Sequence, residues 1–171
     1  MTQRSLVIFA IACMLAVAQE VKPEGNIFAT ASHSAQLSTF ASLIKVAGLD
    51  DTLEGPGPFT VFAPTDAAFT KLPFATIDVL RMPVHKDMLT KVLTYHVVEG
   101  KLSRPLLLRR IEEGHGTAQI RTVGGHTLWL SMQGEEFLLR DEQGNFAKIT
   151  QTDIRQSNGV IHVIDAVVMP K

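Results

Sequence analysis

The sequence predicts a single α+β domain, and three observations lead to this fold class. The chain has 171 residues, 46% of them apolar, which is enough for one buried core and too few for two comfortable domains. Apolar residues recur at helical spacing in the first half of the chain. The second half consists of short apolar runs between glycine-containing turns, which is typical of strands. The sequence contains no internal repeat and no long linker.

The first eighteen residues have the pattern of a secretory signal peptide. Residues 6–18 contain no charged side chain and are too few to cross a bilayer as a helix. Ala16 and Ala18 place small side chains where a signal peptidase reads them, so we expect cleavage after Ala18. A membrane anchor and a lipoprotein lipidated at Cys13 are the alternatives. The expected organisation is a signal peptide at 1–18, a short lead at 19–25 and a folded domain at 26–171.

Charge and cysteine content exclude several classes of function. The chain carries 16 basic and 17 acidic residues, a formal net charge of −1. A nearly neutral chain lacks the basic stripe that nucleic-acid binding requires, so we expect no nucleic-acid partner. Its single cysteine excludes a disulfide framework and a multi-cysteine metal site. We therefore expect a domain that is held together by its core alone.

The expected helices follow from capping residues and from apolar spacing. Asn26 can cap a first helix, Gly48 can end a second, and Thr65 or Asp66 can cap a third. Pro105 can begin a later amphipathic helix over residues 104–113. The stripes expected to face the core are Leu37, Phe40, Leu43, Ile44 and Ala47; Met88, Leu89, Val92 and Leu93 in a helix over 85–93; and Leu106, Leu107 and Ile111.

The expected strands are short apolar runs bounded by turn residues. They cover residues 59–63, 95–98, 117–123, 126–132, 137–140, 146–150 and 160–168. Because side chains alternate along a strand, a strand at 95–98 would place Tyr95 and Val97 on one face and His96 and Val98 on the other.

Common signals of catalysis are absent from the sequence. It has no nucleophile elbow, no phosphate-binding glycine loop and no HExxH motif. His162 alternates with Val160 and Ile164, which favours a hydrogen-bonded core histidine over a metal ligand. We expect no enzymatic activity, no metal and no cofactor. The adjacent acid pairs diverge in either a helix or a strand, which favours a solvated surface; they are Asp50-Asp51, Glu112-Glu113 and Glu135-Glu136.

Three blocks of sequence resemble the signatures of the fasciclin-like domain family. Residues 59–69 resemble its first signature, 93–98 its central tyrosine–histidine motif, and 157–170 its second signature. The blocks occur in family order and at family spacing. The resemblance implies one α+β domain, a β-sandwich-like wedge flanked by several short helices. Trp129 departs from the family pattern, because relatives usually have Val, Thr or Leu in this strand.

Most conspicuous residues of these blocks are expected to build the fold. Phe59 and Phe62 supply core volume, and Pro64 ends their strand. Asn158 and Gly159 supply a turn with positive φ before the last strand. The residues expected to be structural are Phe59, Phe62, Pro64, Thr65, Asp66, Asn158, Gly159 and His162.

For function, the resemblance implies a secreted binding module of the cell-adhesion class, extracellular or periplasmic. Its partner would be an extracellular or cell-surface protein, and we expect the module to be a monomer without a membrane span after signal cleavage. The positions that match the family's binding segments are Tyr95, His96, Asp153 and Ile154. A carboxylate suits receptors that hold a metal wanting an acidic ligand, as integrin-type receptors do. Alternatively, Tyr95 and His96 form a buried hydrogen-bonded pair and Asp153 caps a turn.

A second hypothesis is an extracellular carrier of an apolar ligand such as a pigment or lipid. Some fasciclin-like proteins are associated with such ligands, and methionine and tryptophan side chains suit an apolar groove. The residues offered for this role are Met82, Met88, Leu106, Leu107, Leu108, Trp129 and Met132.

Overall fold

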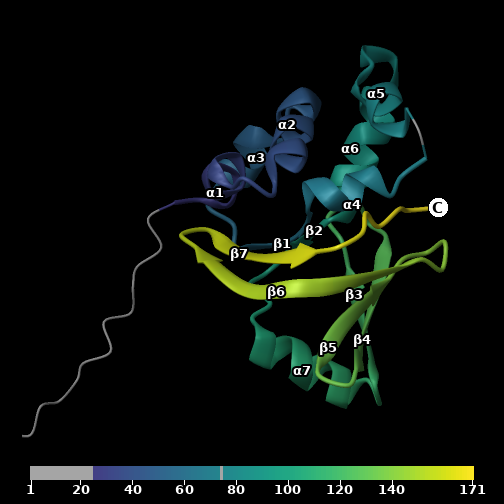
Figure 1. Ribbon diagram of the computed structural model, residues 1–171. Coiled ribbons are helices and arrows are strands. Elements are labelled where there is room, and N and C mark those ends of the chain that lie inside the picture. The colour runs from purple at the N-terminus through teal and green to yellow at the C-terminus, as the bar shows by residue number, and fades with distance from the viewer. Residues whose placement is uncertain (1–24, 74) are drawn as a thin grey trace, which may run out of the picture.

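The computed structural model describes residues 25–73 and 75–171 (Figure 1). The expected signal peptide therefore lies outside the described residues. The helices are α1 (Ile27–His33), α2 (Ser38–Ala47), α3 (Asp50–Glu54), α4 (Asp66–Thr70), α5 (Thr76–Arg81), the 3-10 helix η1 (Pro83–His85), α6 (Lys86–Tyr95) and α7 (Arg104–Glu113). The strands are β1 (Phe59–Pro64), β2 (Val97–Glu99), β3 (Thr117–Arg121), β4 (Thr127–Gln133), β5 (Glu136–Arg140), β6 (Phe146–Gln156) and β7 (Gly159–Ile164).

In the described part of the chain, seven strands form one sheet in the order β2-β1-β7-β6-β5-β4-β3. The central pair, β1 and β7, is parallel, and the other neighbouring pairs are antiparallel. Just after β3, the backbone N–H of Val123 donates to the carbonyl of Val97 in β2, at 2.8 Å. The two edge strands therefore approach each other, and the sheet is nearly closed.

The apolar residues form two cores, one on each side of β1 and β7. Helices α1 to α6 cover one side of these strands, while α7 lies at the opposite end of the molecule (Figure 1). The first core joins these helices to the sheet and includes Phe40, Leu89 and Ile161. The second lies between α7 and the inner faces of β3 to β6, and includes Leu107 and Leu130. The fold is thus an α+β wedge, as the sequence predicts.

Side-chain caps explain where several helices begin. The Asn26 side chain accepts the Ala29 N–H at 2.7 Å, and the Thr65 hydroxyl accepts the Ala68 N–H at 3.1 Å. Asp66 acts on a different helix: its carboxylate accepts the Ser38 hydroxyl at 2.7 Å and the Thr39 N–H at 2.8 Å. Asp66 therefore fixes the start of α2 from 27 residues away along the chain.

Asn158 and Gly159 allow β7 to enter the sheet beside β1. The Asn158 side chain donates to the carbonyls of Leu53 at 2.6 Å and Gly55 at 2.8 Å, and accepts the Ile27 N–H at 3.0 Å. At Gly159 the φ angle is +157°, and a Cβ atom would lie 1.8 Å from the carbonyl oxygen of Phe59. Only glycine permits this close approach of the two strands.

The structure corrects three details of the predicted elements. Residues 95 and 96 are not in a strand, because α6 continues through Tyr95 and the strand begins at Val97. Met88 is 55% exposed and does not face the core, whereas the next residue, Leu89, is fully buried. Finally, β6 extends to Gln156, and β7 ends at Ile164.

Candidate binding site

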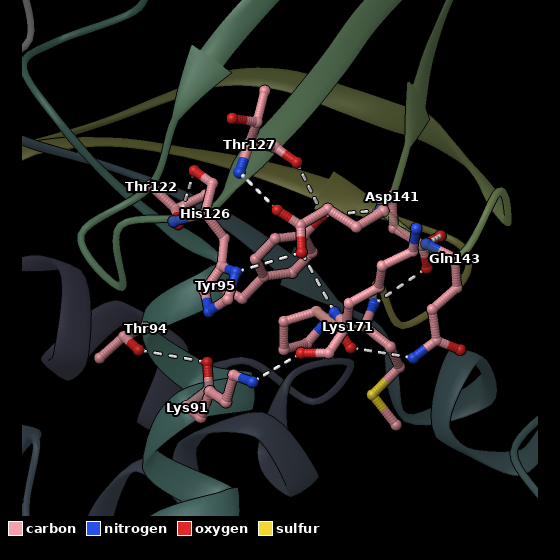
Figure 2. Close-up of polar contacts among 12 residues, drawn as sticks. Lys91, Thr94, Tyr95, Thr122, His126, Thr127, Asp141, Gln143 and Lys171 are labelled. Atoms are coloured by element: carbon pink, nitrogen blue, oxygen red, sulfur yellow. Dashed lines mark hydrogen bonds and ion pairs between the residues drawn. The ribbon is translucent and has the colours of Figure 1, made fainter.

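The tyrosine of the tyrosine–histidine motif lies in a buried polar network between α6 and β4 (Figure 2). Tyr95 has no exposed surface. Its hydroxyl donates to the carbonyl of Thr127 at 2.9 Å and accepts the backbone N–H of Glu142 at 3.1 Å. Burial raises the pKa of this hydroxyl, so the phenol stays neutral. Tyr95 thus connects the end of α6 to Thr127 at the start of β4 and to Glu142, which follows β5.

Glu142 holds the same region together from the surface side. Its carboxylate accepts hydrogen bonds from the Thr127 N–H, the His126 Nδ1–H and the Lys171 N–H, each at 3.1 Å. Desolvation raises the pKa of Glu142, but the two backbone donors and His126 outweigh it, and the net pKa is lowered. The ionised carboxylate is therefore part of the folded structure.

His96 is buried, and both of its ring nitrogens form hydrogen bonds with backbone groups. Its Nδ1 donates to the carbonyl of Val92 at 2.8 Å, and its Nε2 accepts the Val168 N–H at 3.3 Å. Burial lowers the pKa of His96 to about 4. Protonation would place a second hydrogen on Nε2, opposite another donor, so the neutral ring fits this position.

His162 satisfies its hydrogen bonds with the opposite tautomer. Its Nε2 donates to the carbonyl of Leu102 at 2.7 Å, and its Nδ1 accepts the Asp153 N–H at 3.2 Å. The ring stacks on Phe62, its neighbour in the β1–β7 register, at 5.6 Å between centroids. Burial lowers the pKa of His162 as well.

Asp153 and Ile154 lie in an irregular part of β6 and are both half-buried. The β6–β7 register shifts between Gln151 and Ile154, and Asp153 has a φ angle of +59°. The Asp153 Oδ1 atom accepts the Arg104 N–H at 2.7 Å, which caps the start of α7. Because a non-glycine residue with positive φ is strained, this bulge is the unusual backbone feature of the candidate site.

The structure does not bring the four candidate residues into one hydrogen-bonded site. Tyr95 and His96 are buried against β4 and the C-terminal segment. Asp153 contacts the start of α7 and His162. Of the two alternatives left open by the sequence, burial therefore favours a core role for Tyr95 and His96, although the two side chains bond to different partners rather than to each other.

The acidic pair Asp141-Glu142 is the part of this region that sequence reasoning missed. Asp141 is 1% exposed, and its carboxylate accepts the backbone N–H groups of Gln143, Asn145 and Met169 at 2.8–3.0 Å. An aspartate ahead of a Gly-Asn turn is a local signal of such a cap. The contacts to residues 169 and 171 have no sequence signal, because they join segments distant in the chain.

A small, partly open apolar cavity lies between α2, α3, α6 and the nearby strands. It is lined by apolar side chains such as Phe40, Leu49 and Phe59, and its volume is about 20 Å³. This volume admits about one water-sized sphere and no pigment or lipid. None of the seven residues proposed for an apolar-ligand groove lines this cavity. Met82, directly after α5, and Met88, in α6, are both exposed.

The described residues show neither a cluster of metal ligands nor a membrane-spanning helix. Among residues 25–73 and 75–171, no group of three or more His, Cys, Asp or Glu side chains is arranged to hold a metal ion. None of the helices in these ranges is both long enough and apolar enough to cross a membrane.

A nearly closed sheet, a helical cap over one side and motif residues fixed by backbone hydrogen bonds define a scaffold-type α+β domain. The fasciclin domain model matches residues 35–170, and this chain belongs to the fasciclin domain family. The structure is similar to a domain pair of the insect cell adhesion molecule fasciclin I, with a TM-score of 0.72 and 18% identity. That match covers 85% of this chain and 51% of the other, and it supports the fold alone.

Several relatives are similar in sequence. Protein sll1483 of Synechocystis is 37% identical over 145 residues, which cover 85% of this chain and 73% of the relative. The immunogenic protein MPB70 of Mycobacterium bovis is 36% identical over 156 residues, covering 91% and 68%. The cell surface glycolipoprotein MPB83 of the same species is 36% identical over 145 residues, covering 82% and 58%.

Proposed function

We propose that this protein is a secreted, non-catalytic binding module that holds an extracellular or cell-surface protein and acts as a monomer. Membership of the fasciclin family supports the class, and one relative, MPB83, is named a cell surface glycolipoprotein. The main supporting observation is that His96, His162 and Glu142 are engaged by backbone groups. These side chains maintain the fold and do not converge on a reacting centre.

Within this module, we assign the direct contact to the Asp153–Ile154 bulge and a supporting role to Tyr95 and His96. Asp153 is half-buried in a strained bulge of β6, and its Oδ1 atom accepts the Arg104 N–H at the start of α7. Bulges re-aim side chains beside functional sites, which suits a carboxylate offered to a partner. Tyr95 and His96 act at a distance, through the stability of the strands and the C-terminal segment.

Chemical cross-linking tests this function. The purified protein, incubated with the extracellular fraction of its source cells, is expected to cross-link to a defined protein that mass spectrometry identifies. Asp153→Asn should weaken this capture, because it removes the charge but keeps an oxygen for the Arg104 N–H. Asp51→Asn, an exposed acid on α3, is the matched control and should capture as wild type does. Failure of the wild-type protein to capture a partner, or full capture by Asp153→Asn, would contradict the assignment.

A further inference from the structure

Strands β3 to β6 have an outer face that the two cores do not use. In β3, β5 and the first parts of β4 and β6, buried residues alternate with residues that are half-buried or exposed. Inward residues such as Leu128, Leu130 and Leu139 pack in the second core. The outward residues of the face are Thr117, Gln119 and Arg121 in β3; Thr127, Trp129 and Ser131 in β4; Glu136, Leu138 and Arg140 in β5; and Phe146 and Lys148 in β6.

The strand register aligns four of these side chains into one row across the sheet, which we call the aromatic row. Gln119 pairs with Trp129, Trp129 with Arg140, and Arg140 with Phe146. The Arg140 guanidinium lies over the Trp129 ring, 5.0 Å from its centroid. Stacking fixes the guanidinium plane while its N–H donors remain available to a ligand.

The aromatic side chains of this row do not contribute to the folded core. Phe146 is 58% exposed and Trp129 is half-buried, and neither belongs to the two hydrophobic clusters. Leu138, beside them on the same face, is also outside both clusters. A large aromatic side chain that stays exposed on a strand face contributes little to the stability of the fold. Such a side chain is therefore a candidate for ligand binding.

The charge of this face is positive, although the whole chain is nearly neutral. It carries Arg121, Arg140 and Lys148 against the single carboxylate of Glu136, which pairs with Lys148 at 2.6 Å. Neither arginine forms a salt bridge with another of the described residues. Two guanidinium groups therefore remain for an anionic ligand, and a guanidinium fork matches a carboxylate.

We propose that the aromatic row, together with Arg121 on the same face, binds an acidic polysaccharide, with uronate carboxylates on Arg140 and Arg121 and sugar rings against Phe146 and Trp129. Trp129 and Phe146 are two strands apart, roughly 10 Å, which is close to the length of a disaccharide unit. An open sheet face, unlike a pocket, admits a polymer whose ends extend beyond the site. This surface goes beyond the proposed protein-binding function, because it does not include Asp153 or Ile154.

Trp129 is the single tryptophan of the chain, so its fluorescence reports directly on this surface. Titration of the full-length secreted protein with polygalacturonate oligosaccharides should give a saturable fluorescence change, and calorimetry should give the same affinity. Dextran oligosaccharides, which lack carboxylates, should give neither signal. Absence of any change with polygalacturonate up to millimolar concentrations would overturn the proposal, whether or not Asp153-dependent protein capture succeeds.

Variants test which residues carry the binding. By calorimetry, Arg140→Gln should weaken polygalacturonate binding about tenfold or more, and Phe146→Ala several-fold, both with a melting temperature close to wild type. Arg110→Gln, an exposed arginine on α7, is the matched control and should leave the affinity unchanged. If Arg110→Gln weakens binding as much as Arg140→Gln, or if DNA and anionic lipid vesicles bind as tightly as polygalacturonate, the attraction is non-specific and the proposal is wrong.

Discussion

The Nε2 atom of His96 accepts a hydrogen bond from the backbone N–H of Val168, at 3.3 Å. This bond fastens the segment after β7 to the end of α6, 72 residues earlier in the chain. The other ring nitrogen donates to Val92, so the neutral imidazole satisfies both backbone groups. The histidine of the family motif is therefore a connector between two elements that are far apart in sequence.

The depressed pKa of His96 predicts a loss of stability in mild acid. In the unfolded chain its pKa is 6.5 and in the folded chain about 4, so below pH 6.5 the unfolded state binds more protons. The free energy of unfolding should fall as the pH is lowered from 6.5 to 4, by on the order of 3 kcal/mol from this residue. Burial of His162 adds in the same direction.

Urea unfolding at pH 7, 5.5 and 4.5 measures this effect. His96→Gln should be less stable than wild type at pH 7 but lose less unfolding free energy between pH 7 and pH 4.5. His33→Gln, an exposed histidine on α1, should keep the wild-type pH profile. If the unfolding free energy of His96→Gln fell as steeply with pH as that of wild type, the loss of stability would have to come from another titrating group.

Loss of the Glu142 carboxylate should loosen the C-terminal segment and the start of β4 together. Glu142→Ala removes the acceptor for the Thr127 and Lys171 N–H groups, and we expect a cost of about 1–3 kcal/mol in the free energy of unfolding. Glu135→Ala, an exposed neighbour in the β4–β5 turn, should change it by no more than about 0.5 kcal/mol. Equal effects of the two variants in chemical denaturation would refute the assignment.

Gly159 should tolerate no side chain. A Cβ atom there would overlap the Phe59 carbonyl at 1.8 Å, so Gly159→Ala must push β1 and β7 apart and should cost more than about 3 kcal/mol or prevent folding. At Gly134 the φ angle is +62° and a Cβ atom would have no neighbour within 4 Å, so Gly134→Ala should cost only about 1–2 kcal/mol. Similar melting temperatures for both variants would contradict the close approach.

The secreted form should begin at Gln19. Ala16 and Ala18 precede this point in a chain whose first eighteen residues have signal-peptide character. Intact-mass measurement of the protein recovered from outside the cytoplasm tests this prediction. Retention of residues 1–18 would favour the membrane-anchor alternative, and a lipid adduct on Cys13 the lipoprotein alternative.

Local signals predicted most of the elements, because caps and periodicity act within a few residues. The cap at Asn26, the left-handed residue Gly48 at the end of α2 and the helix begun at Pro105 all follow from the sequence. Prediction from the sequence failed where a contact between residues far apart in the chain determined the secondary structure. Tyr95 reads as a strand residue beside two valines, yet its hydrogen bonds to Thr127 and Glu142 fit the last turn of α6.

The candidate site was harder to predict for the same reason. Its motif residues could be recognised, and burial of Tyr95, His96 and His162 was among the interpretations of the sequence. Their hydrogen-bond partners could not be predicted, because the partner segments lie far along the chain. The pairing of Asp66 with the start of α2 and of Asp153 with the start of α7 has no signature in a single sequence. The strands β3 to β6 were expected from the sequence, but only the register aligned Trp129 with Arg140 and Phe146.

The central claim is that Tyr95 stabilises the module whereas Asp153 contacts its partner, and one paired measurement tests it most directly. Affinity for the captured protein and melting temperature are measured for Tyr95→Phe and Asp153→Asn at a temperature where both are folded. We predict that Tyr95→Phe lowers the melting temperature by several degrees at unchanged affinity, since it leaves the Thr127 carbonyl and the Glu142 N–H unpaired. Asp153→Asn should lower the affinity with little change in melting temperature. Loss of affinity in folded Tyr95→Phe, with wild-type affinity in Asp153→Asn, would contradict the account.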